Sequence, residues 1–180
     1  MADVGYGPKP TNQILVAGYP LVQILKVEVA TTMYPGRLVK KGTNDDDIIV
    51  NTAAGAAIGW LGYERTIKKH RPATVDTIYL ADAQAAVLGG GNFVIVASLA
   101  LGQSVSKGAR LVAGAAGELI AATALAVTVP TGTVPVTSTA AQPDLTEAGG
   151  LPPQGIVVAI AEETVDASAA AKDIMVRSLI

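Results

Sequence analysis

The chain has 180 residues, half of them apolar and 16% charged, with a formal net charge of −2. This balance excludes an intrinsically disordered chain, which needs low hydropathy and high net charge, and a protein that binds nucleic acid through a basic surface. The absence of cysteine excludes disulfides, thiolate metal sites and a cysteine nucleophile. A surface so poor in charge indicates that partner proteins cover much of it.

The first 20 residues predict an extended N-terminal arm. They begin MADVGYGPKPTNQ, which has too few large apolar residues to pack a core and lacks the basic and apolar regions of a secretory signal peptide. An arm of this kind orders when it binds a partner surface; the alternative is a frayed chain end. The candidate partner-contact residues in the arm are Tyr6, Pro8, Lys9 and Pro10.

Residues 21–180 predict an all-β domain with little helix, of the small β-barrel or β-tulip-like kind. Short runs rich in β-branched residues recur between glycine and proline turns, which is typical of β-sandwiches and barrels. Strands are expected at residues 24–29, 37–39, 48–50, 77–80, 93–99, 110–112, 119–121, 126–129, 155–160 and 174–176. Two short helices are expected at residues 81–88 and 165–171.

An internal repeat divides this domain into two units, at about residues 24–80 and 93–180. Arg37-Leu38-Val39 matches Arg110-Leu111-Val112 at an offset of 73 residues (110 − 37). "GWLGYE" at 59–64 matches "GIVVAI" at 155–160, and "TIYL" at 77–80 matches "DIMV" at 173–176, both at an offset of 96 residues (155 − 59 and 173 − 77). Because the two offsets differ, the second unit carries a net insertion.

The insertion, residues 123–153, is rich in threonine and proline. It contains the nearly palindromic VTVPTGTVPV, whose prolines cannot donate hydrogen bonds to a central strand. This favours an edge or protruding hairpin that contacts a partner; the alternative is a flexible connector. The candidate contact residues here are Pro130, Thr131, Gly132 and Pro135.

The segment KKGTNDDDII, residues 40–49, raises the question of an ion site because Asp45, Asp46 and Asp47 are adjacent. The second repeat has AGAAGE at the same place, so the repeated scaffold does not need these carboxylates. Neighbouring side chains on a strand face opposite sides, and the ligand spacing of an EF-hand is missing. Since Asn and Asp favour tight turns, we expect an exposed hairpin tip, with a weak Ca²⁺ site as the alternative.

No combination of residues predicts a catalytic, cofactor or metal site. "GGGN" at 89–92 lacks the Lys-Ser/Thr ending of a phosphate-binding loop and is expected to end a helix. His70 is the only histidine and lies among basic residues, and no serine has a G-x-S-x-G context. Glu28 and the pair Glu162-Glu163 are carboxylates that the sequence alone does not bring together. The most apolar window, 111–129, contains Glu118, so no membrane-spanning helix is expected.

The segment MYPGRLVKKGTNDDDIIVNTAAGAAIGWLGYE, residues 33–64, resembles the head decoration, or cement, proteins of tailed phages and related viruses. The shared features are a Gly-Arg-Leu-Val turn and strand, an aliphatic strand and the small segment Ala57-Ile58-Gly59. A second, weaker copy is found in KGARLVAGAAGELIA and PQGIVVAIAEE. The likeness covers residues 24–64 and 93–180, but the insertion at 123–153 is not part of the shared pattern.

The resemblance implies a small β-barrel protein, usually trimeric, that sits where capsid subunits meet. The implied function is that of a structural virion protein on the capsid surface, which decorates and stabilises the assembled capsid without catalysis. Its implied partners are the major capsid protein and further copies of itself, with no nucleic acid, membrane or cofactor. Two alternatives are a surface or fibre-type β module and a small-molecule-carrying β-barrel, although Lys40-Lys41 lacks the neighbours of a lipoyl or biotinyl lysine.

Overall fold

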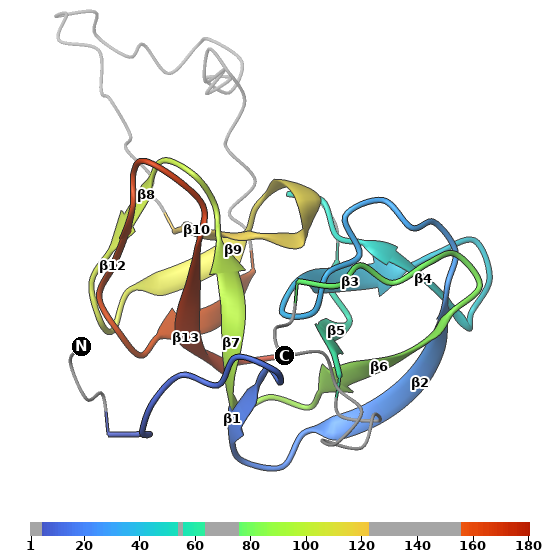
Figure 1. The fold of residues 1–180 in the computed structure, drawn as a ribbon, viewed down its shortest axis with the longest axis horizontal. Coiled ribbons are helices and arrows are strands. Elements are labelled where there is room, and N and C mark those ends of the chain that lie inside the picture. The colour runs from blue at the N-terminus through green and yellow to red at the C-terminus, as the bar shows by residue number, and fades with distance from the viewer. Residues whose placement is uncertain (1–4, 54–55, 64–75, 123–155) are drawn as a thin grey trace, which may run out of the picture.

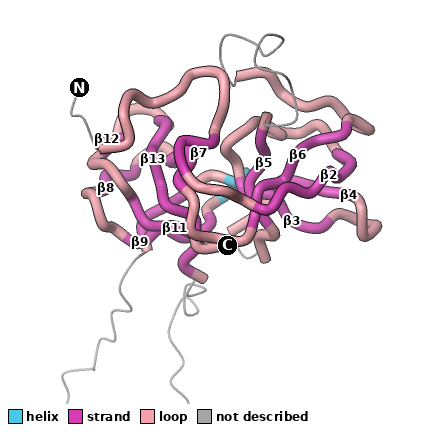
Figure 2. The backbone as a smooth tube through the Cα atoms, turned by 90° about the horizontal axis from the view of Figure 1, so that it is seen from below, coloured by secondary structure: helices cyan, strands magenta, loops and turns pink. Residues whose placement is uncertain are grey.

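The computed structural model describes residues 5–53, 56–63, 76–122 and 156–180, and within these ranges the fold is almost entirely β (Figure 1). Thirteen strands and one short 3-10 helix, Ala115–Gly117, are present in the described residues. Ten of the strands form two closed five-stranded barrels that lie side by side (Figures 1 and 2). The prediction of an all-β, small-barrel fold is therefore confirmed.

Barrel 1 is built from the first part of the chain. Its strands are β2 (Leu21–Val27), β3 (Leu38–Lys41), β4 (Asp47–Val50), β5 (Gly59–Gly62) and β6 (Gln84–Gly89). They pair in the order β2-β4-β3-β5-β6, and β6 pairs back with β2 to close the ring. The contact between β2 and β4 is parallel, and the other four are antiparallel.

Barrel 2 is built from the second part. Its strands are β7 (Val94–Leu99), β9 (Arg110–Ala113), β10 (Leu119–Ala121), β11 (Val157–Ala161) and β13 (Lys172–Ser178). They pair in the order β7-β10-β9-β11-β13, and β13 pairs back with β7. Again one contact, β7 with β10, is parallel and the others are antiparallel.

Three further strands lie outside the two rings. β1 (Leu15–Ala17) pairs antiparallel with the first residues of β7. β8 (Gln103–Val105) and β12 (Val165–Ala167) form a separate two-stranded ribbon on barrel 2. Val105 and Ala167 of this ribbon are buried in the core of barrel 2, so the ribbon covers part of that barrel.

The two barrels have the same strand order, the same strand directions and matching pairing positions. The pairings around each ring assign five equivalent buried residues: Val27 and Leu99, Val39 and Leu111, Ile48 and Leu119, Leu61 and Ala161, Val87 and Val176. Around the ring, each assignment agrees with the pairing to both neighbouring strands. The repeat is thus a repeat of complete five-stranded units.

The register of the repeat differs from the one expected from the sequence. The strand pairings place Val39 at the position of Leu111, an offset of 72 residues (111 − 39), one residue shorter than the Arg-Leu-Val match gives. Ile78 lies in a loop, and the residue equivalent to Ile174 is Ala85, which is buried in β6. Gly155 is outside the described residues.

Neither expected helix is present. Residues 84–88 of the first one belong to β6, and residues 165–167 of the second form β12. β6 is buried on both faces, because Ala85 and Val87 face the interior of barrel 1 while Leu88 packs against barrel 2. A strand buried on both faces has no alternating pattern, so an alanine-rich run such as QAAVL is easily mistaken for a helix. The strand expected at 77–80 is a loop instead.

The buried side chains form two clusters. One fills the interior of barrel 1 and contains Val27, Met33, Val39, Ile48, Leu61, Ala85 and Val87. The other fills barrel 2 and extends to barrel 1 through Leu38, Trp60 and Leu88, which are on the outer face of barrel 1. Both interiors are occupied by the protein's own side chains, which disfavours a barrel that carries a small molecule.

A tight linker, residues 89–92, joins barrel 1 to barrel 2. Gly90, Gly91 and Asn92 all have positive φ (94°, 68° and 59°), a conformation that glycine and asparagine adopt at the lowest cost. The Gly91 N–H donates to the Ile180 carbonyl and the Asn92 N–H to the Ser178 carbonyl, each at 2.8 Å. The GGGN motif thus connects two strands and does not end a helix.

Candidate interaction surface

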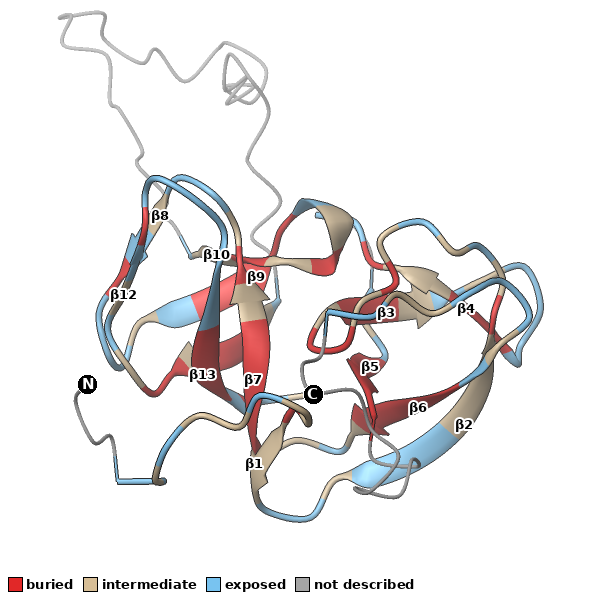
Figure 3. Cartoon of the chain, in the orientation of Figure 1, coloured by how far each residue is buried: buried red, intermediate tan, exposed pale blue. Residues whose placement is uncertain are grey.

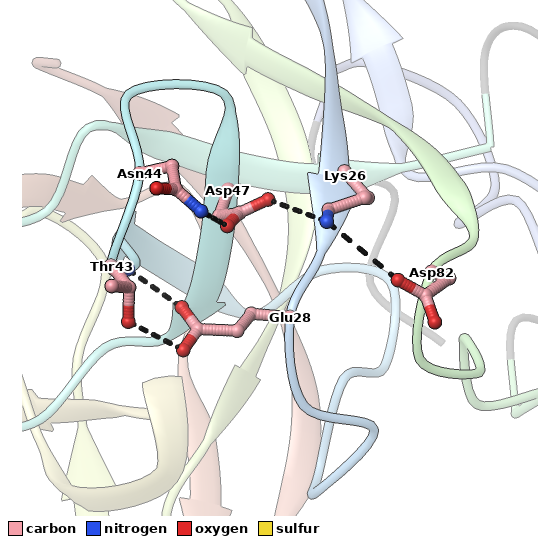
Figure 4. A network of polar contacts seen from close by, with 6 residues as sticks. All are labelled: Lys26, Glu28, Thr43, Asn44, Asp47 and Asp82. Carbon is pink, nitrogen blue, oxygen red and sulfur yellow. Dashed lines mark hydrogen bonds and ion pairs between the residues drawn. The ribbon is translucent and has the colours of Figure 1, made fainter.

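The acidic turn joins β3 to β4, and its carboxylates have different partners. The Asp45 side chain is exposed and pairs with Lys41, with 2.7 Å between Asp45 Oδ1 and Lys41 Nζ. Asp46 is also exposed. Asp47 is 3% exposed and its carboxylate lies between Asn44 and Lys26 (Figure 4), so the expectation of an exposed tip is wrong for this residue.

Asp47, at the start of β4, connects the acidic turn to β2. Its Oδ2 accepts a hydrogen bond of 2.6 Å from Asn44 Nδ2, and its Oδ1 lies 3.2 Å from Lys26 Nζ of β2. Lys26 Nζ also lies 3.7 Å from Asp82 Oδ1, just before β6 (Figure 4). The hydrogen bond from Asn44, assisted by Lys26, holds the pKa of Asp47 below its ordinary value of 3.8 although burial opposes this.

Glu28 fixes the other side of the same turn. Its two carboxylate oxygens accept hydrogen bonds from the Thr43 hydroxyl and the Thr43 backbone N–H, each at 2.7 Å (Figure 4). These bonds to Thr43 lower the pKa of Glu28 from its ordinary value of 4.5. The turn is therefore held against β2 and the residue that follows it by charge-assisted hydrogen bonds, which are roughly twice as strong as neutral ones.

The other carboxylates considered for acid–base chemistry also make structural contacts. Glu162 Oε1 lies 3.4 Å from Arg177 Nε, and Glu163 Oε1 accepts a hydrogen bond of 2.7 Å from the Met175 N–H. Both are in barrel 2, whereas Glu28 follows β2 of barrel 1, so the structure does not bring them together. Across 5–53, 56–63, 76–122 and 156–180, no three His, Cys, Asp or Glu side chains form a group that can hold a metal ion.

The arm lies against barrel 2 at one charged point. Lys9 Nζ lies 2.6 Å from Glu163 Oε1 and donates a hydrogen bond of 2.7 Å to the Asp173 carbonyl. Tyr6 and Pro8 are exposed, and Pro10 is half-buried. Burial raises the pKa of Asp173, an effect that Lys9 opposes. Of the four predicted contact residues in the arm, Lys9 is thus bound to the protein itself, and Tyr6 and Pro8 face outward.

Several predicted features lie outside the described residues. These are the insertion at 123–153, with Pro130, Thr131, Gly132 and Pro135, and the basic stretch around His70. Within the described ranges, no helix has the length and apolar character needed to cross a membrane.

Sequence reasoning missed a group of exposed apolar side chains around the linker. The Leu21 side chain lies next to Gly90, and the backbones of Ile58 and Leu179 lie next to Gly89 and Gly91. Tyr19 follows Gly18, where an added Cβ would lie 2.8 Å from the Cβ of Phe93, the residue after the linker. Tyr19, Leu21, Ile58 and Leu179 are all exposed, and together we call them the junction patch. Large exposed apolar groups that lie together mark interaction sites more often than isolated ones do.

Comparison with known proteins identifies a family. The model of the XM1 gp53 minor capsid protein family matches residues 12–150. This match includes β1, all of barrel 1, strands β7, β9 and β10 of barrel 2, and β8 of the ribbon. No curated protein matches the chain. Because the family match spans well over half of the sequence, it establishes membership and places the protein in the virion, among the components of the capsid. The chain belongs to the XM1 gp53 minor capsid protein family.

Proposed function

We propose that this protein decorates the outer surface of the assembled capsid and stabilises it without catalysis. Family membership supports a structural role in the virion. The resemblance of residues 33–64 to capsid cement proteins supports the finer assignment to the outer surface.

One observation carries the proposal: several charged side chains bind partners within the molecule, while a group of large apolar side chains is exposed. Glu28, Asp47 and Glu118 each bind a partner within the chain, namely Thr43, Lys26 and Arg37. The junction patch, by contrast, is apolar and exposed. Apolar surface of this kind contributes roughly 25 cal/mol per Å² when a partner covers it.

The contacts with the capsid are assigned to the arm, the insertion and the junction patch. Tyr6 and Pro8 present an exposed aromatic ring and an exposed proline on the arm, while Lys9 holds the arm on barrel 2. Pro130, Thr131, Gly132 and Pro135 complete the proposed contact set. The two barrels, which share a core, act as the rigid mount for these segments.

The physical basis of stabilisation is linkage. A protein that binds the assembled lattice but not free subunits shifts the assembly equilibrium by mass action. Many copies on one particle act together, so a modest affinity per contact strengthens the whole shell. We further propose that the protein is a homotrimer, because a trimer matches the places where three capsid subunits meet; light scattering coupled to size-exclusion chromatography measures its mass.

Cosedimentation with undecorated capsid shells tests the proposal. The wild-type protein is expected to sediment with shells and to raise the temperature at which they disrupt. Deletion of residues 2–12 is expected to weaken binding while leaving the barrels folded, because the ring pairings do not involve these residues. The matched control is Lys9→Met, which releases the arm from Glu163 but keeps its length. Wild-type protein that never sediments with shells contradicts the decoration role, and full binding by the deletion variant removes the arm from it.

A further inference from the structure

The equivalence of the two barrels allows their sheet edges to be compared residue by residue. β2 and β7 occupy the same place, with Val27 equivalent to Leu99. β2 pairs with β4 only at Lys26 and Val27, and β7 pairs with β10 only at Leu99. In both barrels the first residues of this strand therefore extend beyond the parallel partner and present an edge on that side.

In barrel 2 this edge is covered by β1 of the same chain. Leu15 pairs with Ile95, Ala17 pairs with Val94, and the Val96 N–H donates a hydrogen bond of 2.8 Å to the Ile14 carbonyl. The residues from Phe93 to Val96 are all buried, at 5% exposure or less. The N-terminal strand thus completes barrel 2.

In barrel 1 the equivalent edge has no strand on it within the described residues. At the offset of 72 (99 − 27), the segment Phe93 to Val96 corresponds to Leu21 to Ile24. Leu21 is 72% exposed and Val22 is 50% exposed, and Figure 3 shows the start of β2 as exposed surface. Phe93 and Val94 of barrel 2 are buried, whereas the equivalent Leu21 and Val22 of barrel 1 are exposed.

The backbone groups at this edge point outward. The Lys26 N–H donates to the Asp46 carbonyl at 2.8 Å on the β4 side, whereas the Val27 N–H donates to the Ala83 carbonyl at 2.9 Å on the β6 side. Because successive residues of a strand point to opposite edges, Ile24 and Val22 present their N–H and C=O groups on the same side as Lys26. In the part of the chain that the structure describes, these groups have no strand to pair with.

The sequence of this edge does not protect it. Exposed edges are usually blunted by a charge, a proline or a bulge. Pro20 and Lys26 flank this edge, but the five residues between them, LVQIL, have none of these features. We infer that the open edge of β2 accepts an extended strand of a capsid subunit, which adds antiparallel to β2 in the place that β1 takes on β7. The occupant is an uncharged, apolar segment similar in chemistry to the LVA of β1.

The choice of a capsid subunit rests on the proposed function. The family places other capsid components beside this protein, and strand addition to an open sheet edge is a common mode of peptide recognition. The chain's own β1, the one segment seen in this role, is already bound to β7. The alternative occupant is a second copy of this chain, paired edge to edge through β2, and the experiment must distinguish it from a capsid subunit.

The test uses cosedimentation with shells assembled from the major capsid protein alone. Val22→Pro removes an outward N–H and places a ring on the edge, and proline is tolerated at edge positions whose N–H faces solvent. Val22→Thr keeps the branched shape and the N–H, so it is the matched control. Val22→Pro is expected to lose about tenfold or more in apparent affinity, because backbone hydrogen bonds to the incoming strand are lost, and Val22→Thr is expected to bind nearly as the wild type does.

Hydrogen exchange resolved to single amides gives a readout on the wild type that does not depend on any variant. On binding to shells, the Val22 and Ile24 amides are expected to become protected. The Val96 amide, already bonded to Ile14, is protected in both states and serves as the internal reference. Protection confined to other segments contradicts strand addition even if Val22→Pro fails to fold.

The remaining outcomes separate the two proposals. A folded Val22→Pro variant that binds shells at full strength overturns strand addition but leaves the decoration role intact. Equal losses of shell affinity in Val22→Pro and Val22→Thr indicate that the Val22 side chain makes only an apolar contact, and they also overturn strand addition. If Val22→Pro has a smaller mass in solution than the wild type but binds shells equally well, the β2 edge pairs with a second copy of this chain. Wild-type protein that does not sediment with shells overturns both proposals.

Discussion

The Trp60 indole N–H donates a hydrogen bond of 2.9 Å to the Ser178 hydroxyl and so connects barrel 1 to barrel 2. Both residues are fully buried. Ser178 in turn donates to the Ile180 carbonyl at 2.7 Å, which fixes the C-terminus beside the linker. Trp60 is on the outer face of barrel 1, in the core cluster of barrel 2. The joint between the barrels is thus a shared core with a polar link inside it.

This link predicts the behaviour of two variants. Ser178→Ala leaves the buried indole N–H without its acceptor and is expected to lower the free energy of unfolding by about 1–3 kcal/mol. Trp60→Phe removes the donor and leaves a cavity, so it is expected to cost at least as much. Denaturant unfolding measures both, with the exposed Ser106→Ala as control. Losses that simply add in the double variant would show that the two side chains are not coupled.

The close contact between the two barrels at Gly117 allows a second, steric test of their interface. Gly117 has φ of +71°, and a Cβ placed on it would lie 2.5 Å from the Leu38 carbonyl oxygen in barrel 1. Gly102 has a similar φ of +85° but open space around its Cβ position, so Gly102→Ala measures the conformational cost alone, about 1 kcal/mol. Gly117→Ala must also displace backbone and is expected to cost about 2 kcal/mol more. Equal thermal stabilities of the two variants would contradict this close contact.

Much of the fold could be predicted because turn chemistry and β-branched runs are local signals. The expected strand 119–121 coincides with β10. The expected strands at 37–39 and 48–50 overlap β3 and β4, with bounds that differ by at most two residues at either end. What failed was the run at 81–88, where burial on both faces outweighs the helix preference of its alanines.

The register of the repeat could not be read from residue similarity. Leu38 and Leu111 look equivalent in the sequence, yet Leu38 packs outward against barrel 2 and its neighbour Val39 faces the interior of barrel 1. A shift of one residue turns every side chain of a strand to the other face. Register follows from strand pairing, which the Arg-Leu-Val pattern does not encode.

The candidate surface was predicted only in part for a similar reason. The exposed positions of Tyr6 and Pro8 follow from the composition of the arm, but the ion pair of Lys9 with Glu163 joins residues far apart in the chain. The open edge of β2 depends on where β4 begins relative to β2 and on which barrel β1 joins. Both are tertiary facts that no local pattern contains.

The acidic turn predicts a contrast between neighbouring aspartates. Asp45→Asn and Asp46→Asn are expected to change the melting temperature little, because both side chains are exposed. Asp47→Asn is expected to lower it by several degrees, because the buried side chain loses its charge-assisted contacts with Asn44 and Lys26. Differential scanning calorimetry makes the comparison. A chelator that lowers the melting temperature of the wild type would instead indicate a bound cation at the turn.

The same carboxylates predict how stability depends on pH. The pKa values of Glu28 and Asp47 are lower in the folded protein than their ordinary values of 4.5 and 3.8, through hydrogen bonds from Thr43 and Asn44 respectively. At acidic pH the unfolded chain therefore binds more protons than the folded one at these two groups, so their contribution is present above about pH 5 and is lost as pH falls through the folded values. Asp173 acts in the opposite direction, because burial raises its pKa and its protonation favours the folded state.

We expect the free energy of unfolding to change little between pH 8 and about pH 5, within the usual range of maximal stability, and to fall below it. Urea unfolding at a series of pH values measures this curve. In a Glu28→Gln variant, one of the groups that protonates is gone, so the acid decline is expected to be shallower than in the wild type. The control is Asp173→Asn, which removes the opposing group and is expected to steepen the decline. An unchanged slope in Glu28→Gln would contradict the assignment of the Thr43 hydrogen bonds as a source of acid sensitivity.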